Sequence, residues 1–171
     1  MSRLVLIGGG VRSGKSAFAL DRGRALGERR AFLATGQPFD EEMRARIALH
    51  KAGRGDDFRT IEVPLALVDA VRTLEDVEVA VIDCLTLWLS NMLMQGHDEA
   101  QIDREVRALV DAADGARFSV VVVTNEVGMG VVPETPLGRI FRDVTGRAHQ
   151  LIARQVLAGG GEGELPSPRG Y

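Results

Sequence analysis

The sequence predicts an α/β fold in which a mainly parallel sheet is covered by helices on both faces. Short apolar runs of strand length alternate along the chain with longer segments that carry apolar residues at helical spacing. A glycine-rich turn follows the first apolar run and leads directly into a helix-forming segment. Because such alternation implies right-handed crossovers between parallel strands, we expect ligands at the carboxyl ends of the strands.

The N-terminal half is predicted to hold three strands and three helices. The apolar run Leu4-Val5-Leu6-Ile7 indicates the first strand, and Gly27 ends the helix that follows the glycine-rich turn. Gly36-Gln37-Pro38 breaks the second strand, and Asp40 is placed to cap the next helix. Pro64 closes a short third strand. We expect strands over about 3–8, 30–35 and 60–63, and helices over about 15–26, 40–54 and 65–74.

The C-terminal half is predicted to add two strands and three helices. The runs VEVAVID at 77–83 and FSVVVVT at 118–124 indicate buried strands. Helices are expected over about 85–94, 98–113 and 137–157. The segment around Trp88 is too apolar for a surface helix, which favours core packing over a subunit interface or a substrate wall. We expect one domain over 1–158 and a disordered tail over 159–171, because the tail has few apolar residues.

Composition limits the classes of function. A chain of 171 residues with 45% hydrophobic and 26% charged residues is typical of one globular domain. The net charge of −3 argues against a broad nucleic-acid-binding face. The single cysteine, Cys84, excludes an intramolecular disulfide. No apolar run reaches membrane-spanning length, so we expect a cytoplasmic protein without a membrane span or a nucleic-acid partner.

The glycine-rich turn matches the phosphate-binding pattern G-x-x-x-x-G-K-[ST]. Glycines allow backbone N–H groups to surround an anion, and the positive end of the following helix faces that anion. In this pattern Lys15 reaches the β- and γ-phosphates of ATP or GTP, and Ser16 binds Mg²⁺. The complete pattern in a strand–loop–helix setting disfavours a plain glycine-rich turn. The predicted nucleotide-binding residues are Gly9, Gly10, Val11, Arg12, Ser13, Gly14, Lys15 and Ser16.

Further polar residues follow the other predicted strands. Asp83 ends an apolar strand, where it can hold Mg²⁺ beside Ser16 or simply cap the next helix. His50 shares a helix face with Arg46 and Arg54, and this spacing alone favours a solvated helix over an imidazole nucleophile. Other strand ends carry polar groups that ordinary turns also explain, namely Thr35-Gly36-Gln37, Glu62 and Thr124-Asn125-Glu126.

Five segments carry motifs that occur together in one enzyme family. They are GGGVRSGKS at 8–16, DEEMRARIALHKAGR at 40–54, TIE at 60–62, VIDCLTLWLSNML at 81–93 and VTNEVGMGVVPETPLGRIFRDVTGRAHQ at 123–150. Together they resemble the bifunctional adenosylcobinamide kinase / adenosylcobinamide-phosphate guanylyltransferase family of cobalamin biosynthesis. The resemblance covers about residues 3–157, and its last block is far more specific than the phosphate-binding loop.

The resemblance implies two successive reactions. ATP or GTP phosphorylates the aminopropanol hydroxyl of adenosylcobinamide. GMP then passes from GTP to adenosylcobinamide phosphate through a covalent GMP–histidine, giving adenosylcobinamide-GDP and pyrophosphate. By resemblance, His50 is the catalytic histidine, Lys15 assists it, and a homotrimer with a P-loop α/β fold is expected. The implied nucleotide site extends to Thr35, Gly36, Lys51, Ala52, Gly53, Arg54, Glu62 and Asp83, with Ser16 and Asp83 as Mg²⁺ ligands.

The C-terminus departs from the family pattern. Family members usually end with a hydrophobic strand after the last helix, whereas this chain continues as GGGEGELPSPRGY. We therefore expect a sheet that is one strand short of the family's sheet. Two other functions stay open on the sequence. One is a P-loop kinase of another small alcohol in which His50 is incidental, and the other is a non-catalytic nucleotide-binding module.

Overall fold

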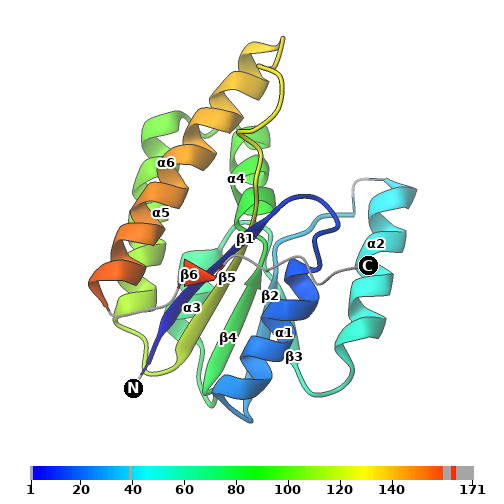
Figure 1. Ribbon diagram of the computed structural model, residues 1–171, viewed down its shortest axis with the longest axis vertical. Coiled ribbons are helices and arrows are strands. Elements are labelled where there is room, and N and C mark those ends of the chain that lie inside the picture. Colours follow the sequence, from blue (N-terminus) through cyan, green and yellow to red (C-terminus); the bar gives the residue numbers. More distant parts are fainter. Residues whose placement is uncertain (1, 39, 160–162, 165–171) are drawn as a thin grey trace.

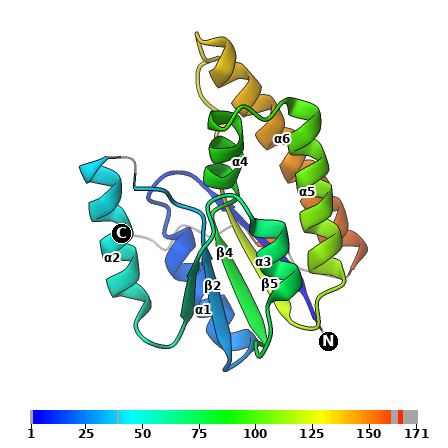
Figure 2. The same ribbon diagram turned by 180° about the vertical axis from the view of Figure 1, so that it is seen from behind.

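The computed structural model describes residues 2–38, 40–159 and 163–164, without the side chains of Arg46, His50, Arg54 and Glu164. Figures 1 and 2 show a central sheet with helices on both of its faces. The elements in chain order are β1 (Leu4–Gly9), α1 (Lys15–Leu26), β2 (Arg30–Ala34), α2 (Glu41–Arg54), β3 (Arg59–Glu62), α3 (Leu67–Thr73), β4 (Val79–Asp83), α4 (Leu85–Met94), α5 (Glu99–Asp114), β5 (Ser119–Asn125), α6 (Pro136–Ala158) and β6 (Gly163–Glu164).

The strands form one sheet in the order β3-β2-β4-β5-β1-β6, and every pairing is parallel. β5 therefore lies between β1, which leads into the phosphate-binding loop, and β4, which ends at Asp83. In the register, Gly9 pairs with Asn125, and Asp83 pairs with Ala34 and Val123. This pairing brings the ends of β1, β2, β4 and β5 to one edge, as the α/β prediction requires.

Two hydrophobic clusters fill the space on either side of the sheet. Val120 and Val122 of β5 belong to the cluster that α3, α4, α5 and α6 cover. Val121 and Val123 belong to the cluster on the opposite face, where α1 packs. This alternation follows from the two-residue period of a strand, and both faces are buried, as expected for a parallel sheet.

Several local predictions are confirmed. Asp40 caps α2, since its carboxylate accepts a hydrogen bond of 2.7 Å from the backbone N–H of Met43. Trp88 is fully buried in the core, and its ring Nε1 donates to the carbonyl of Leu65 at 2.8 Å. The five predicted strands and six predicted helices are all present, with bounds within about two residues of those expected. None of the helices in the described part of the chain has the length and apolar content that a membrane crossing requires.

The expectation of a missing C-terminal strand was wrong. Gly163 and Glu164 form β6, which pairs in parallel with Leu6 and Ile7 at the edge beside β1. The composition argument failed because strand pairing uses backbone N–H and C=O groups, which a glycine-rich segment also has. The rest of the predicted tail, 160–162 and 165–171, lies outside the described residues, so the domain limit at residue 158 stays a prediction.

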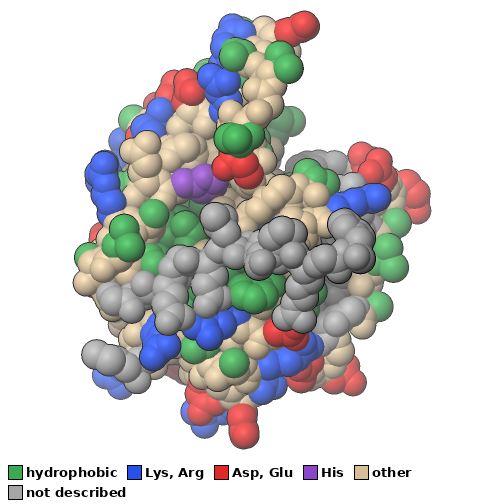
Figure 3. Space-filling model, in the orientation of Figure 1, with side chains coloured by type: hydrophobic (Ala, Val, Ile, Leu, Met, Phe, Trp, Pro, Cys, Tyr) green, Lys and Arg blue, Asp and Glu red, His purple; other side chains and the backbone are tan. Residues whose placement is uncertain are grey.

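Two helices extend beyond the body of the sheet. The N-terminal end of α6 rises past the carboxyl edge of the strands, and α2 stands beside the β3 edge (Figures 1 and 2). The chain that leads into α6 and the first turn of α6 expose apolar side chains at the top of the molecule in Figure 3. These are Met129, Val131, Val132 and Leu137.

Replacement of Trp88 by alanine tests its role in the core. Removal of a fully buried indole loses apolar burial and leaves a cavity, so we expect Trp88→Ala to lower the free energy of unfolding by about 3–5 kcal/mol. Trp88→Phe keeps most of the burial and loses the hydrogen bond to Leu65, so its effect should be smaller. Urea unfolding measures both values. An alanine variant as stable as the wild type would contradict this assignment.

Candidate active site

The phosphate-binding loop connects β1 to α1 and bends through two left-handed residues. Arg12 and Gly14 have φ angles of 58° and 80°, and Gly14 is the N-cap of α1. Glycine adopts this conformation without steric cost, so the helix can begin at Lys15 with its N–H groups directed at the loop. The Lys15 side chain is buried, and its Nζ donates to the carbonyl of Gly10 at 3.0 Å. The lysine is thus held within the loop that it is predicted to serve.

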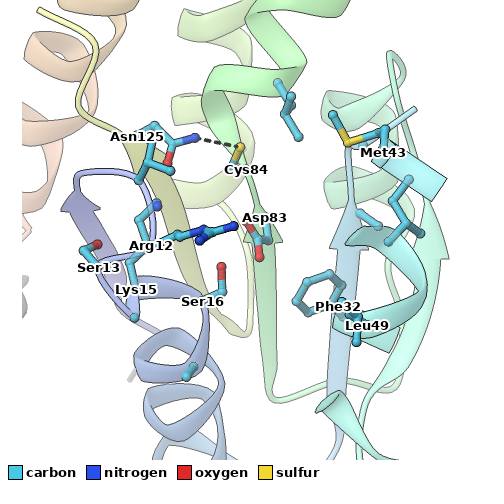
Figure 4. A pocket seen from close by; sticks show the side chains of 17 residues that line it. Arg12, Ser13, Lys15, Ser16, Phe32, Met43, Leu49, Asp83, Cys84 and Asn125 are labelled. Atoms are coloured by element: carbon cyan, nitrogen blue, oxygen red, sulfur yellow. Dashed lines mark hydrogen bonds between the residues drawn. The ribbon is translucent and has the colours of Figure 1, made fainter. Parts of the chain in front are cut away.

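A cavity of about 570 Å³ opens beside this loop and has two chemically different walls. This volume lies within the usual range for small-molecule sites. Figure 4 shows polar side chains from the loop, β4 and β5 on one side and apolar side chains near α2 on the other. The polar lining includes Arg12, Ser13, Lys15, Ser16, Asp83 and Asn125, and the apolar lining includes Phe32, Ala34, Met43, Ile47, Leu49 and Leu87. Such a site suits a ligand with a charged part and a flat or apolar part.

Ser16 and Asp83 fit the chemistry of a Mg²⁺ site. In Figure 4 both side chains point into the space between the loop and the end of β4, and the Arg12 guanidinium extends into the same space. Mg²⁺ prefers oxygen ligands and keeps several waters, so one hydroxyl and one carboxylate beside a bound phosphate are a usual set. Among the described residues, no group of three or more His, Cys, Asp and Glu side chains could hold a metal ion by itself. A metal here would accordingly depend on the bound nucleotide for further ligands.

The side chain of Thr35, which follows β2, does not line the cavity. Thr35 is fully buried, and its hydroxyl bonds to the backbone of Cys84. Gly36, the next residue, lines the cavity. Any contact of this turn with a nucleotide would therefore involve Gly36 and not the Thr35 side chain.

The predicted catalytic histidine lies on α2, which forms the apolar wall. Met43 and Ile47 of this helix line the cavity. The side chains of His50 and Arg54 lie outside the described part of the chain, so their roles stay predictions. Gly53 is likewise described only as helix backbone.

Three other predicted residues are away from the cavity wall. Lys51 and Ala52 are exposed near the end of α2, and Glu62 is exposed at the end of β3. The Lys51 ammonium and the Glu62 carboxylate form an ion pair at 2.5 Å, which ties α2 to β3. The structure thus joins two of the predicted nucleotide-binding residues to each other, while neither lines the cavity.

Among the lining residues that were not predicted as site residues, Asn125 and Cys84 carry polar or ionisable groups. Asn125 was noted only as a strand-end residue, yet its amide lies at the cavity between the loop and β4 (Figure 4). Its Nδ2 donates to the Thr86 hydroxyl at 3.2 Å and contacts the Cys84 sulfur at 3.9 Å. Burial, helped by the charge of Asp83, raises the pKa of the Cys84 thiol to about 11. Cys84 is therefore a neutral lining group and not a nucleophile at physiological pH.

A histidine on the other face of the sheet holds α6 against β5. His149 Nε2 lies 2.7 Å from the Thr124 hydroxyl, and burial lowers the pKa of its imidazole although the Glu126 carboxylate opposes this shift. An unfolded chain, with a histidine pKa near 6.5, therefore binds a proton more readily than the folded protein. The stability that neutral His149 contributes is fully present above the unfolded-state pKa of about 6.5. It is lost as the pH falls through the lower pKa of the folded protein.

Urea unfolding at several pH values tests this linkage. We expect the wild-type midpoint to fall on acidification from about pH 8 to pH 5, and His149→Gln to lose part of that dependence because glutamine does not titrate. The same substitution at His97, in the connection between α4 and α5, controls for the removal of a histidine. Equal pH dependence in the wild type and His149→Gln would contradict the assignment.

Comparisons with known proteins show the family to which the chain belongs. A model of the family described as cobinamide kinase / cobinamide phosphate guanyltransferase matches residues 5–158. The bifunctional adenosylcobalamin biosynthesis protein CobP of Pseudomonas aeruginosa is 41% identical over 151 residues, covering 88% of this chain and 87% of that protein. The bifunctional adenosylcobalamin biosynthesis proteins CobU of Escherichia coli and Salmonella typhimurium are 37% and 36% identical over 167 residues. Each match covers 88% of this chain and 90% of the relative.

A solved structure of the RadB recombinase is also similar, with a TM-score of 0.48 and 20% identity over 81% of this chain and 70% of that chain. The family match and the identities to the three curated relatives extend over nearly all of the domain that carries the cavity. This chain belongs to the cobinamide kinase / cobinamide phosphate guanyltransferase family.

Proposed function

We propose that this chain phosphorylates adenosylcobinamide with ATP or GTP and then transfers GMP from GTP to the adenosylcobinamide phosphate. Family membership supports both reactions, since the family description combines a kinase and a guanyltransferase. The observation that carries the proposal is the cavity between the phosphate-binding loop and α2. One nucleotide placed there would have its triphosphate at the loop and the helix that carries His50 on its other side.

The kinase reaction would use the loop side of this cavity. The substrate hydroxyl oxygen attacks the γ-phosphorus and its proton passes to water, while the bond to the β–γ bridging oxygen breaks and the nucleoside diphosphate leaves. Lys15 and the N–H groups at the start of α1 stabilise the negative charge on the phosphate oxygens. Ser16 and Asp83 would hold a Mg²⁺ ion that neutralises part of that charge. Catalysis of this kind depends mainly on positioning and on electrostatic stabilisation.

Guanylyl transfer would take place at the α-phosphate of GTP. A neutral ring nitrogen of His50 attacks the α-phosphorus, and the bond to the pyrophosphate oxygen breaks. A phosphate oxygen of adenosylcobinamide phosphate then attacks the same phosphorus, and the phosphorus–nitrogen bond breaks to release His50. Division into two displacements allows one site to hold GTP first and the bulky corrinoid second. We include Arg54, Lys51, Ala52, Gly53 and Glu62 in the nucleotide site as part of this proposal.

The assembly and the location belong to the same proposal. We infer a homo-oligomer, specifically a trimer, in the cytoplasm. The exposed apolar side chains of Met129, Val131, Val132 and Leu137 support a subunit contact, because a cluster of this kind on a surface usually marks an interaction site. Sedimentation equilibrium tests the trimer directly, and a monomer at micromolar concentration would contradict it.

A labelling experiment tests the histidine intermediate. Incubation with GTP that carries label in its α-phosphate should give a protein adduct that is labile in acid and stable in base, as a phosphorus–nitrogen bond is. His50→Ala should abolish this label, whereas His97→Gln, in the connection between α4 and α5, should keep it. Label that persists in His50→Ala would reject the histidine assignment. Phosphorylation of adenosylcobinamide without any label would favour a kinase alone, and nucleotide binding without either reaction would favour a binding module.

Substitution of Lys15 tests whether both reactions share the loop. We expect Lys15→Ala to lower the kcat of kinase and guanylyl transfer alike by about 10²–10³-fold, because one charged donor to the transition state is lost. Arg72→Ala, an exposed cation on α3, is the control and should leave both rates unchanged. Loss of only one activity in Lys15→Ala would show that the two reactions use separate nucleotide sites.

A further inference from the structure

We infer that Thr35 is a positioning residue for Asp83 and acts through the backbone that carries this carboxylate. The inference rests on the proposed role of Asp83 as a Mg²⁺ ligand. Thr35 follows β2 at the edge of the cavity, yet its side chain is fully buried and does not line the cavity. A buried hydroxyl beside a ligand site needs a partner, and its partners in this fold are the atoms around Asp83.

Three hydrogen bonds join Thr35 to residues 83 and 84. The Thr35 hydroxyl donates to the carbonyl of Cys84 at 2.7 Å and accepts from the Cys84 N–H at 2.8 Å. The Thr35 N–H donates to the carbonyl of Asp83 at 3.2 Å. Both polar groups of the peptide unit between Asp83 and Cys84 are therefore bonded to Thr35. This peptide unit begins at the Asp83 Cα, so its position sets the point from which the carboxylate extends.

The backbone carbonyl of Thr35 is in turn hydrogen-bonded by a side chain of α4. Nδ2 of Asn91 donates to the Thr35 carbonyl at 2.8 Å and to the Pro64 carbonyl at 2.9 Å. Asn91 is buried on α4, the helix that begins directly after Cys84. The segment from Asp83 to Asn91 of α4 therefore bonds to Thr35 at both of its ends. These bonds connect the turn after β4 to the turn after β2. In a connected hydrogen-bond network of this kind, loss of one member affects the others.

The position of these bonds explains why they matter for a metal ligand. The ladder that pairs β4 with β2 and β5 ends at Asp83, which pairs with Ala34 and Val123. Beyond that pair, the Thr35 hydroxyl satisfies the N–H of buried Cys84. Mg²⁺ demands near-ideal octahedral geometry, so a small displacement of Asp83 relative to Ser16 weakens its site. Loss of a residue that orients a metal ligand costs about 10–100-fold in metal affinity or activity.

Metal binding measured apart from turnover tests the inference. The probe is Mn²⁺, whose free concentration is followed by electron paramagnetic resonance in the presence of a GTP analogue with non-cleavable bridging groups. We expect Thr35→Val to weaken Mn²⁺ binding by about 10–100-fold and to leave the affinity for the metal-free analogue unchanged, because the phosphate-binding loop is intact. Thr35→Ser keeps the hydroxyl and should bind Mn²⁺ like the wild type.

Two further variants complete the comparison. Thr73→Val removes an exposed hydroxyl that bonds to the Asp69 carbonyl within α3, so it is the matched control and should bind Mn²⁺ normally. Thr35→Ala removes the same hydroxyl as Thr35→Val without new branching, and it replaces the valine variant if that protein does not fold.

Asp83→Asn separates failure of the inference from failure of the proposed metal site. Weak Mn²⁺ binding in Asp83→Asn and Thr35→Val, with normal binding in Thr35→Ser, supports the inference. Weak binding in Asp83→Asn with normal binding in Thr35→Val overturns the inference and keeps Asp83 as a ligand. Normal binding in Asp83→Asn overturns the proposed metal site and the inference with it. Equal weakening in Thr35→Ser and Thr35→Val also overturns the inference, because the hydroxyl would then not be the cause.

Discussion

Parallel backbone pairing of β1, β5 and β4 is the constraint on which the site depends. It places Gly9 beside Asn125 and brings Asp83 to the same edge through the pairing of β4 with β5. These residues are far apart in the sequence, and no local interaction would assemble them. Because all these strands run in one direction, their carboxyl ends, and the turns that carry the polar side chains, lie together. The buried valines of β5, which contribute to both hydrophobic clusters, stabilise this arrangement from the two faces of the sheet.

The two walls of the cavity differ in how firmly the fold holds them. The loop side is anchored by β1, by α1 and by the buried Lys15, whose ammonium bonds to Gly10. The opposite wall is α2, and none of its described side chains belongs to either buried cluster. Its links to the body include partly buried Met43 and Ile47 and the exposed ion pair between Lys51 and Glu62. The proposed triphosphate site thus faces a helix held mainly by surface contacts, which stabilise it weakly.

The fold was largely predictable because its signals are local. Apolar runs, glycine and proline breaks and the Asp40 cap each depend on a few neighbouring residues. β6 was not predictable in this way, because two residues at an edge pair through their backbone and leave no pattern in composition. The contributions of Asn125 and Cys84 to the cavity depend on strand order. The ion pair of Lys51 and Glu62 likewise joins separate elements, which the periodicity of either element does not show.

Thr35 shows most clearly where sequence reasoning about a site stops. A threonine after a strand is compatible with a ligand contact, a helix cap or a turn, and its identity does not distinguish them. Only the structure shows that the hydroxyl faces the Cys84 backbone and not the cavity. Buried polar groups gather at this end of the sheet, including Thr35, Thr86, Asn91 and Thr124, and each has a hydrogen-bond partner. Since an unpaired buried group is costly, such a cluster persists only where its geometry is fully specified. The same specification holds the strand ends in the positions that nucleotide chemistry requires.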